Sequence, residues 1–197
     1  MNITVNGQKI DSTLENEKTV GDVLTAFQAI CDENAAAVIG IAVDGERITA
    51  AHFDTVAQRT LTPETSFAFD VITKQALLTT FKELSERFTL LAGRMEQIPA
   101  ALQNGHGNDA RESIAELADA IDSFCHTTAL ASLFPEILDA VSVEGKKLAD
   151  FISEFPPLLA DFEQALAAQD TVQIGDLAEY EICPRLTALG AALRNDA

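Results

Sequence analysis

The longest regular pattern of apolar and polar positions in this chain runs from Leu77 to Ile98. Its apolar residues recur in alternating steps of four and three, and they are Leu77, Phe81, Leu84, Phe88, Leu91, Met95 and Ile98. This spacing puts them on one face of a helix over about three heptads, and a helix with such a face needs partner helices along its length. The pattern therefore predicts a long central helix that begins near Thr73 or Lys74 and ends before Pro99, with a frayed end through Leu102.

The chain after this helix shows the same kind of spacing, which predicts a bundle of about four to six helices. One apolar face follows a predicted helix start at Asn108 or Asp109 and comprises Ala110, Ile114, Leu117, Ile121 and Phe124. Further helical faces are expected within residues 129–141, 148–155, 157–168 and 172–193. Pro184 lies inside the last of these and predicts a kink, because it removes a backbone N–H that an α-helix needs. The small Gly93 of the central helix is expected to let another helix approach closely.

Residues 1–73 show shorter periods, with strand-like runs placed around two tight turns. The dipeptides Asn6-Gly7 and Asp44-Gly45 are strong hairpin signals, because both positions of such turns need a positive φ. Thr19 is placed to cap one amphipathic helix, whose apolar face is Val20, Val23, Leu24, Phe27, Ile30 and Cys31. The predicted strands are Asn2–Val5, Gln8–Ile10, Val38–Val43, Glu46–Thr49 and Ser66–Thr73, and residues 50–65 are predicted to be irregular.

The order of these elements, which is hairpin, helix, strand, short strand and final strand, resembles the β-grasp fold of ubiquitin-like proteins. Sulfur carriers and modifiers of that fold end in a free Gly-Gly, whereas here the last strand continues through Ile72 and Thr73 into the long helix. The resemblance therefore implies a scaffold or recognition module and not a carrier. The expected fold class is α+β: a small β-grasp-like domain at 1–73, followed without a flexible linker by an all-α helical bundle at 74–197.

The chain is strongly acidic, with 13 Lys and Arg against 31 Asp and Glu and a formal net charge of −18. Clustered Lys and Arg are typical of nucleic-acid-binding proteins, and an anionic membrane surface would repel this chain, so neither is an expected partner. The simpler interpretation of the acidity is that it keeps the protein soluble. The other interpretation is that it attracts a basic protein partner. Because no apolar run approaches the length of a membrane span and no signal-like segment begins the chain, we expect a cytoplasmic protein.

Catalytic, metal-binding and cofactor-binding motifs are missing from the sequence, so we expect a protein that is not an enzyme and that holds no cofactor or metal. Cys31, Cys125 and Cys183 lie far apart and are expected to be reduced and mostly buried. Cys125 is followed directly by His126, but zinc sites usually supply paired ligands two to four residues apart. Neighbouring helical residues also point about 100° apart, which argues against a Cys-His catalytic pair.

The most unusual stretch runs from Gly175 to Leu186, and it is the candidate site that the sequence offers. It places the chain's single tyrosine between two glutamates, one turn before Pro184. Tyrosine is a good interface anchor, so the candidate partner-binding residues are Asp176, Glu179, Tyr180, Glu181 and Arg185. The alternative is that Tyr180 packs against a neighbouring helix and the glutamates are only solvated. The stretch also resembles small uncharacterised bacterial proteins of a similar two-part layout, which implies a bacterial source and no activity.

These observations favour a cytosolic protein-interaction module, either an adaptor or a chaperone-like protein. A groove between bundle helices, or an exposed sheet edge, would take an amphipathic helix or a strand from a basic partner. In its acidity and helical content the chain is broadly similar to bacterial secretion and flagellar export chaperones. Two alternatives stay open: a structural subunit that self-associates into a homodimer through the heptad seams, and a small-ligand binder or enzyme with a site at the domain junction.

Overall fold

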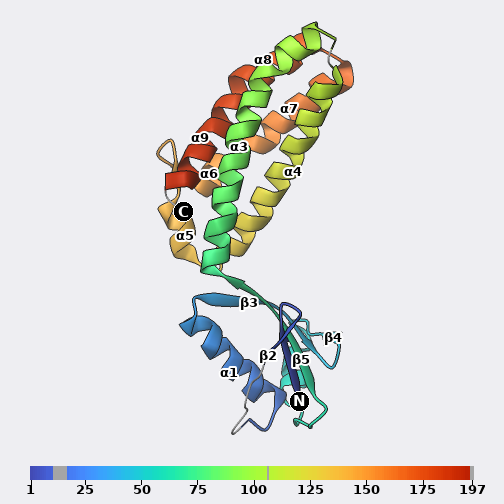
Figure 1. Cartoon of the computed structure of the whole chain (residues 1–197), viewed down its shortest axis with the longest axis vertical. Helices are drawn as coiled ribbons and strands as arrows, with labels where there is room; N and C mark the ends of the chain where they lie inside the picture. The colour runs from blue at the N-terminus through green and yellow to red at the C-terminus, as the bar shows by residue number, and fades with distance from the viewer. Residues whose placement is uncertain (11–16, 106, 196–197) are drawn as a thin grey trace. The chain divides into compact units, whose positions relative to one another are not determined.

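The chain has a mixed α/β architecture, with a sheet in its N-terminal part and helices in its C-terminal part (Figure 1). The computed structural model describes residues 1–10, 17–105 and 107–195, the side chains of residues 109 and 195 excepted. Two compact units make up the chain, Met1–Ala76 and Leu77–Ala197. The sequence placed the boundary between its two predicted domains three residues earlier, after Thr73.

The N-terminal unit is built on a five-stranded mixed sheet with the strand order β2-β1-β5-β3-β4. Its strands are β1 (Asn2–Val5), β2 (Gln8–Ile10), β3 (Ala36–Val43), β4 (Glu46–Arg47) and β5 (Ser66–Thr73). The central pair, β1 and β5, is parallel, and every other pair is antiparallel. All five predicted strands are present, with differences of no more than two residues at their ends.

The two predicted hairpin turns are confirmed by the backbone. Asn6 and Gly7 have φ values of 49° and 77°, and Asp44 and Gly45 have 52° and 83°. Asn6 has a second role, because its side chain accepts a hydrogen bond from the N–H of Val71 at 2.8 Å and donates one to the Val71 carbonyl at 3.0 Å. The side chain of Asn6 thus extends the pairing with β5 beyond the last residue of β1.

Helix α1 (Val20–Glu33) packs against the sheet and closes the core of this unit. Thr19 caps it as predicted, since its side chain accepts from the Asp22 N–H while the Asp22 carboxylate accepts from the Thr19 N–H. Phe27 of α1 stacks on Phe69 of β5 with ring centroids 3.8 Å apart. The buried core residues are Ile3, Val20, Val23, Leu24, Phe27, Cys31, Ala36, Val43, Phe67 and Phe69.

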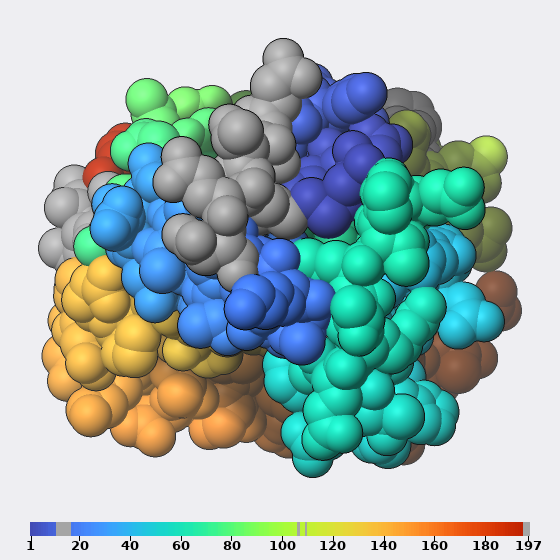
Figure 2. All heavy atoms as spheres, turned by 90° about the horizontal axis from the view of Figure 1, so that it is seen from below, coloured from blue at the N-terminus to red at the C-terminus, as the bar shows by residue number. Residues whose placement is uncertain are grey.

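A short helix, α2 (Phe53–Ala57), lies in the segment that the sequence predicted to be irregular. One turn and a half of helix is too short to produce a detectable apolar period, which is why the pattern missed it. The chain that follows α2 runs beside the start of α1, where the Val20 N–H donates to the Arg59 carbonyl at 2.9 Å. Figure 2 shows α1, in blue, and this segment, in teal, on one face of the unit.

The C-terminal unit is a bundle in which α3 is the central helix (Figure 1). Its long helices are α3 (Lys74–Gln103), α4 (Gly107–Ala131) and α7 (Phe155–Ala168), followed by the continuous stretch α8 (Thr171–Asp176), η1 (Leu177–Ile182) and α9 (Cys183–Asn195). Shorter elements connect α4 to α7, namely α5 (Pro135–Ala140), β6 (Ser142–Val143), β7 (Lys146–Lys147) and α6 (Leu148–Ile152). All seven residues of the predicted α3 seam are at most 4% exposed, so the seam is the core of this unit.

Two local predictions in this unit were wrong, and one hairpin was not predicted. Helix α3 continues through Pro99 to Gln103, and the proline ring packs against Gly175, where an added Cβ would lie 3.3 Å from it. The predicted helix 129–141 is broken between Ala131 and Pro135. Glu144 and Gly145, with φ values of 52° and 77°, form a third tight hairpin between β6 and β7. In the described part of the chain, no helix combines the length and the apolar character needed to cross a membrane.

Candidate functional site

The stretch that contains Tyr180 forms a π-helix, η1, between α8 and α9. The N–H of Cys183 donates to the carbonyl of Ala178, five residues back, instead of the four of an α-helix. Pro184 gives the reason, because it has no N–H and an α-helix would leave the Tyr180 carbonyl without its donor. The sequence predicted a kink at this place, and the structure accommodates the proline by widening the turn before it.

Tyr180 points away from the bundle and is 65% exposed, so it does not pack into a neighbouring helix. The negative charge of Glu179 and a hydrogen bond to its carboxylate raise the pKa of Tyr180, with a smaller contribution from Asp176. These three residues therefore form one small acidic patch around an exposed aromatic ring.

Glu181 and Arg185 belong to a different arrangement. Arg185 Nη1 lies 2.7 Å from the Glu181 carboxylate and also donates to the Glu181 carbonyl at 2.9 Å. Arg185 Nε also lies 3.9 Å from the Glu154 carboxylate. Glu154 accepts a hydrogen bond from Lys146, and this bond is the main reason why the pKa of Glu154 is lowered. The five candidate residues are thus divided between a solvent-facing patch and an ion-pair network that ties α9 to the segment before α7.

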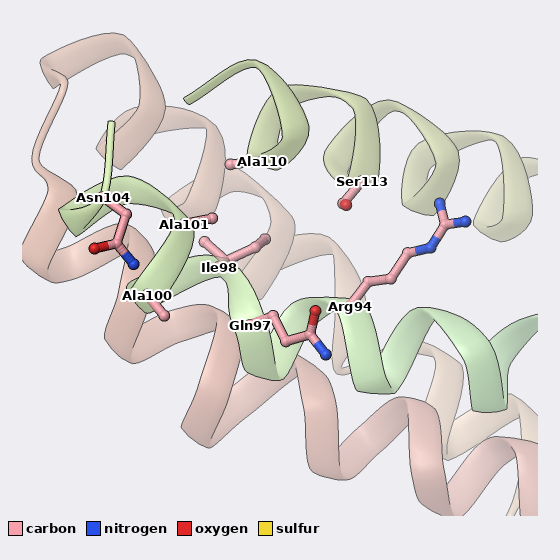
Figure 3. Close-up of a pocket in the computed structure, with 8 residues that line it drawn as sticks. All are labelled: Arg94, Gln97, Ile98, Ala100, Ala101, Asn104, Ala110 and Ser113. Atoms are coloured by element: carbon pink, nitrogen blue, oxygen red, sulfur yellow. The ribbon is translucent and has the colours of Figure 1, made fainter. Parts of the chain in front are cut away.

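A groove between α3 and α4 has a volume of about 390 Å³ (Figure 3). It exists because Ala100, Ala101 and Ala110 fill little of the space between the two helices. The groove has a mixed polar and apolar lining, and its other lining residues are Arg94, Gln97, Ile98, Asn104 and Ser113. Figure 3 shows the Arg94 side chain reaching across to α4, where it forms an ion pair with Glu116.

The second groove lies between α4 and α7, has a volume of about 290 Å³ and is mostly apolar. We refer to it as the α4–α7 groove. Its lining residues are Ile114, Leu117, Ala118, Ile121, Asp122 and Cys125 of α4 and Leu159, Phe162, Glu163 and Leu166 of α7. Leu117 and Phe162 are fully buried, whereas Ile114, Ile121, Leu159 and Leu166 are only half-buried. Branched apolar side chains therefore remain partly open to solvent along both sides of the groove.

A smaller hollow of about 120 Å³, the end hollow, continues the α4–α7 groove toward the start of α8. The two share Ile114 and Leu166, and the end hollow adds Arg111, Thr171 and Ile174. Together they run along α4 from Cys125 back to Gly107, which is about 27 Å of helix. That length is about five turns of an α-helix.

Charged side chains lie at both ends of this continuous groove. Asp122 lies toward one end and Arg111 lines the other, while Glu163 of α7 lies between Leu159 and Leu166, near the middle. None of the three makes an ion pair with any residue that the structure describes. Their charges are therefore available to a molecule that enters the groove.

Only part of this groove had a signal in the sequence. The heptad spacing assigned Ile114 and Ile121 to the core, because periodicity cannot distinguish a core position from one that lines a groove. Asp122 and Glu163 look like ordinary solvated carboxylates. The expectation that the cysteines are mostly buried was wrong for Cys125, which is exposed at one end of the groove, whereas Cys31 is buried and Cys183 is half-buried.

The arrangement offers apolar contact surface and fixed charges. Within residues 1–10, 17–105 and 107–195, no three His, Cys, Asp or Glu side chains lie close enough together to hold a metal ion. The pKa values of Cys31 and Cys183 are raised chiefly by burial, which makes these thiols less reactive at neutral pH.

Comparison with known proteins finds a family model that matches each part of the chain. Residues 1–73 match the model of the TP0873 N-terminal domain, and residues 78–191 match that of a domain of unknown function, DUF8042. An uncharacterised protein of Treponema pallidum (strain Nichols) is 26% identical over 184 residues, which cover 93% of this chain and 92% of that protein. No solved structure matches the chain.

Proposed function

The chain belongs to the family of the DUF8042 domain, whose model spans most of the helical unit, and we propose that this unit is a protein-docking module. The α4–α7 groove takes an amphipathic helix of a partner protein that carries basic residues, and the protein acts in the cytoplasm as a non-enzymatic adaptor or chaperone-like protein. The observation that carries the proposal is the half-buried apolar lining of this groove with unpaired carboxylates at its edge.

The apolar lining supports a helix as the occupant. Ile114, Ala118, Ile121 and Cys125 follow each other along α4 in steps of four and three, and Leu159, Glu163 and Leu166 do so along α7. A partner helix with apolar residues at the same spacing would complete the burial of Ile114 and Ile121. Each Å² of apolar surface removed from water contributes about 25 cal/mol, so a few hundred Å² is a substantial driving force.

The charges support a basic partner. Asp122 and Glu163 line the groove and form no ion pair with a described residue, and the chain as a whole carries a net charge of −18. A basic helix would pair with the two carboxylates and would also be attracted at long range, which raises the association rate. The acidic patch of Asp176, Glu179 and Tyr180 adds to the same field, although it lies outside the groove.

The N-terminal unit is proposed to be a β-grasp scaffold. Its sheet order, the parallel central pair and one helix packed on the sheet support this assignment. The outer strands β2 and β4 have only three and two residues, so they offer few backbone groups to an added strand. For this reason we favour the α4–α7 groove over a sheet edge as the docking surface.

Self-assembly through the α3 seam has less support than docking. The seam residues are already buried inside a single chain, and the free energy of their burial is used in folding the bundle. A second copy that places one of its helices in the α4–α7 groove would be a different interaction, and the experiment below detects it as a captured or co-eluting copy of this protein.

The test compares capture of partners from a lysate of the source cells by three forms of the protein. Ile121→Lys puts a charge in the groove, and Leu90→Lys makes the same change at an exposed position of α3, where the side chain is 71% exposed and lines none of the grooves described above. We expect a protein that the wild type and Leu90→Lys retain and that Ile121→Lys loses. A recombinant fragment of that protein with a basic amphipathic helix should then bind directly. Equal retention by all three forms would refute docking in this groove.

A further inference from the structure

The charges of the α4–α7 groove also fix the direction of its occupant. We infer that the bound helix lies antiparallel to α4, with its basic N-terminal end at Asp122 and its C-terminal end at Arg111. This inference rests on the proposed docking function and adds the orientation and the charge pattern of the partner helix.

Arg111 and Asp122 lie on the same side of α4. They are separated by three helical turns, or about 16 Å along the axis. Glu163 lines the groove from α7, between Leu159 and Leu166, and so lies near the middle. The groove therefore presents the Asp122 carboxylate at one end and the Arg111 guanidinium at the other, with Ile114, Ile121 and other apolar residues between them.

The remaining groups along the groove leave this polarity intact. The residues that line the α4–α7 groove include no Lys, Arg or His, so no lining residue neutralises the charges of Asp122 and Glu163. Asp170 lies next to the end hollow, but its carboxylate caps α8 by accepting from the N–H groups of Val172 and Gln173 at 3.2 and 3.0 Å. Gln169 and Thr171, which also line that hollow, are uncharged.

A helix carries a partial positive charge at its N-terminus and a partial negative charge at its C-terminus. The carboxylate end of the groove therefore attracts the N-terminus of an occupant, and Arg111 attracts its C-terminus. Because α7 approaches Cys125 with Leu159 and the end hollow with Leu166, the occupant would run parallel to α7. Basic side chains in the first turn and acidic ones in the last turn strengthen the preference.

The experiment uses two model peptides of sixteen residues with identical composition. Both have leucines at the groove-facing spacing, alanines elsewhere, and blocked termini. One carries lysines in its first turn and glutamates in its last, and the other has these charges exchanged. Because the exchange also changes the helicity of the free peptides, each is titrated against the wild-type protein and against a charge-reversed variant, Arg111→Glu with Asp122→Lys and Glu163→Lys.

We expect the lysine-first peptide to bind the wild type about fivefold to tenfold more tightly than the glutamate-first peptide, and the charge-reversed variant to invert this order. Equal binding of both peptides, or a preference for glutamate first, would overturn the inferred direction and leave the docking function in place. Failure of both peptides to bind the wild type would overturn the docking function itself.

A second measurement needs no change to the groove charges. Cys125 lies at the carboxylate end, so its thiolate should attack a lysine-first peptide whose added N-terminal cysteine is supplied as a mixed disulfide with nitrothiobenzoate. This exchange releases the nitrothiobenzoate thiolate, and it should be faster than with the same peptide activated at a C-terminal cysteine. Cys183→Ser removes the half-buried thiol from the reaction, and Cys31 is buried. The opposite order of trapping rates would show that the helix lies the other way round.

Discussion

Ser85 donates a hydrogen bond of 2.6 Å from its hydroxyl to the carbonyl oxygen of Gly190, which lies 105 residues further along the chain. This buried bond joins the central part of α3 to α9. Glycine permits it, because a Cβ at position 190 would lie 3.0 Å from Thr89 Oγ1 and 3.1 Å from the Ser85 carbonyl. The backbone of α9 thus lies directly on α3.

Gly190→Ala tests this close packing. The added methyl group meets the backbone of α3, so we expect the variant to lose about 1–3 kcal/mol in free energy of unfolding, measured by urea denaturation. Ser85→Ala should also destabilise, because it leaves the Gly190 carbonyl buried without this donor. Full stability of Gly190→Ala would show that the two helices can move apart at no cost.

Gly93→Ala is the matched control in the same pair of helices. The sequence suggested that Gly93 allows a helix to approach, but no atom lies within 4 Å of a Cβ added there, and the residue is exposed. Alanine should therefore stabilise α3 by up to about 1 kcal/mol through its higher helix propensity. A loss of stability would mean that the surface of α3 at Gly93 is covered.

Phe88→Ala tests the α3 seam. Phe88 is fully buried and its ring meets that of Phe124 edge to face, with centroids 5.5 Å apart. Removing the ring leaves a cavity in the core of the bundle, so we expect a loss of about 3–5 kcal/mol in free energy of unfolding. A loss below 1 kcal/mol would show that the seam is not the core of the folded protein.

The fold could be read from the sequence where strong local signals agreed with each other. The α3 seam, the turns at Asn6-Gly7 and Asp44-Gly45, and the cap at Thr19 are all of this kind. The misreading of Pro99 has a different origin. A proline near a helix end removes a single hydrogen bond, and its contact with Gly175, 76 positions away, depends on tertiary structure that no local pattern contains.

The candidate site was less accessible to sequence reasoning than the fold. The stretch around Tyr180 was found because proline in a helix is rare, and its wide turn follows from that proline. The α4–α7 groove was not predicted, because whether side chains between α4 and α7 leave a groove depends on the distance between the two helices, which no local sequence pattern contains. Ile121 and Phe124 follow the same spacing, yet Phe124 is fully buried and Ile121 is half open to solvent.

The pKa of Tyr180 can be measured without interference, because the chain has one tyrosine and no tryptophan. Glu179 raises this pKa through its charge, so Glu179→Gln should lower it, as followed by the absorbance of the phenolate during a pH titration. Glu181→Gln is the control and should change the value little, because the Glu181 carboxylate pairs with Arg185. An equal shift in both variants would place Tyr180 elsewhere than beside Glu179.

The exposed position of Tyr180 predicts that its removal leaves the fold intact. Tyr180→Ala together with Glu179→Lys should change the free energy of unfolding by less than about 0.5 kcal/mol, because the ring is 65% exposed. If the acidic patch contributes to partner binding through its field, the same double variant should reduce the association rate and its dependence on salt, with little change in dissociation. Unfolding of the bundle by this double change would mean that Tyr180 is a core residue.

The three thiols should differ in reactivity in a way that reports directly on the groove. Cys125 is exposed, whereas Cys31 and Cys183 are more buried and have raised pKa values, and only the thiolate reacts with a disulfide reagent such as Ellman's reagent. We therefore expect one fast-reacting thiol at pH 8 in the folded protein and three after unfolding. Cys125→Ser should abolish the fast phase and Cys183→Ser should preserve it. A fast phase that persists undiminished in Cys125→Ser would show that another thiol reacts fast and that Cys125 is not the exposed one.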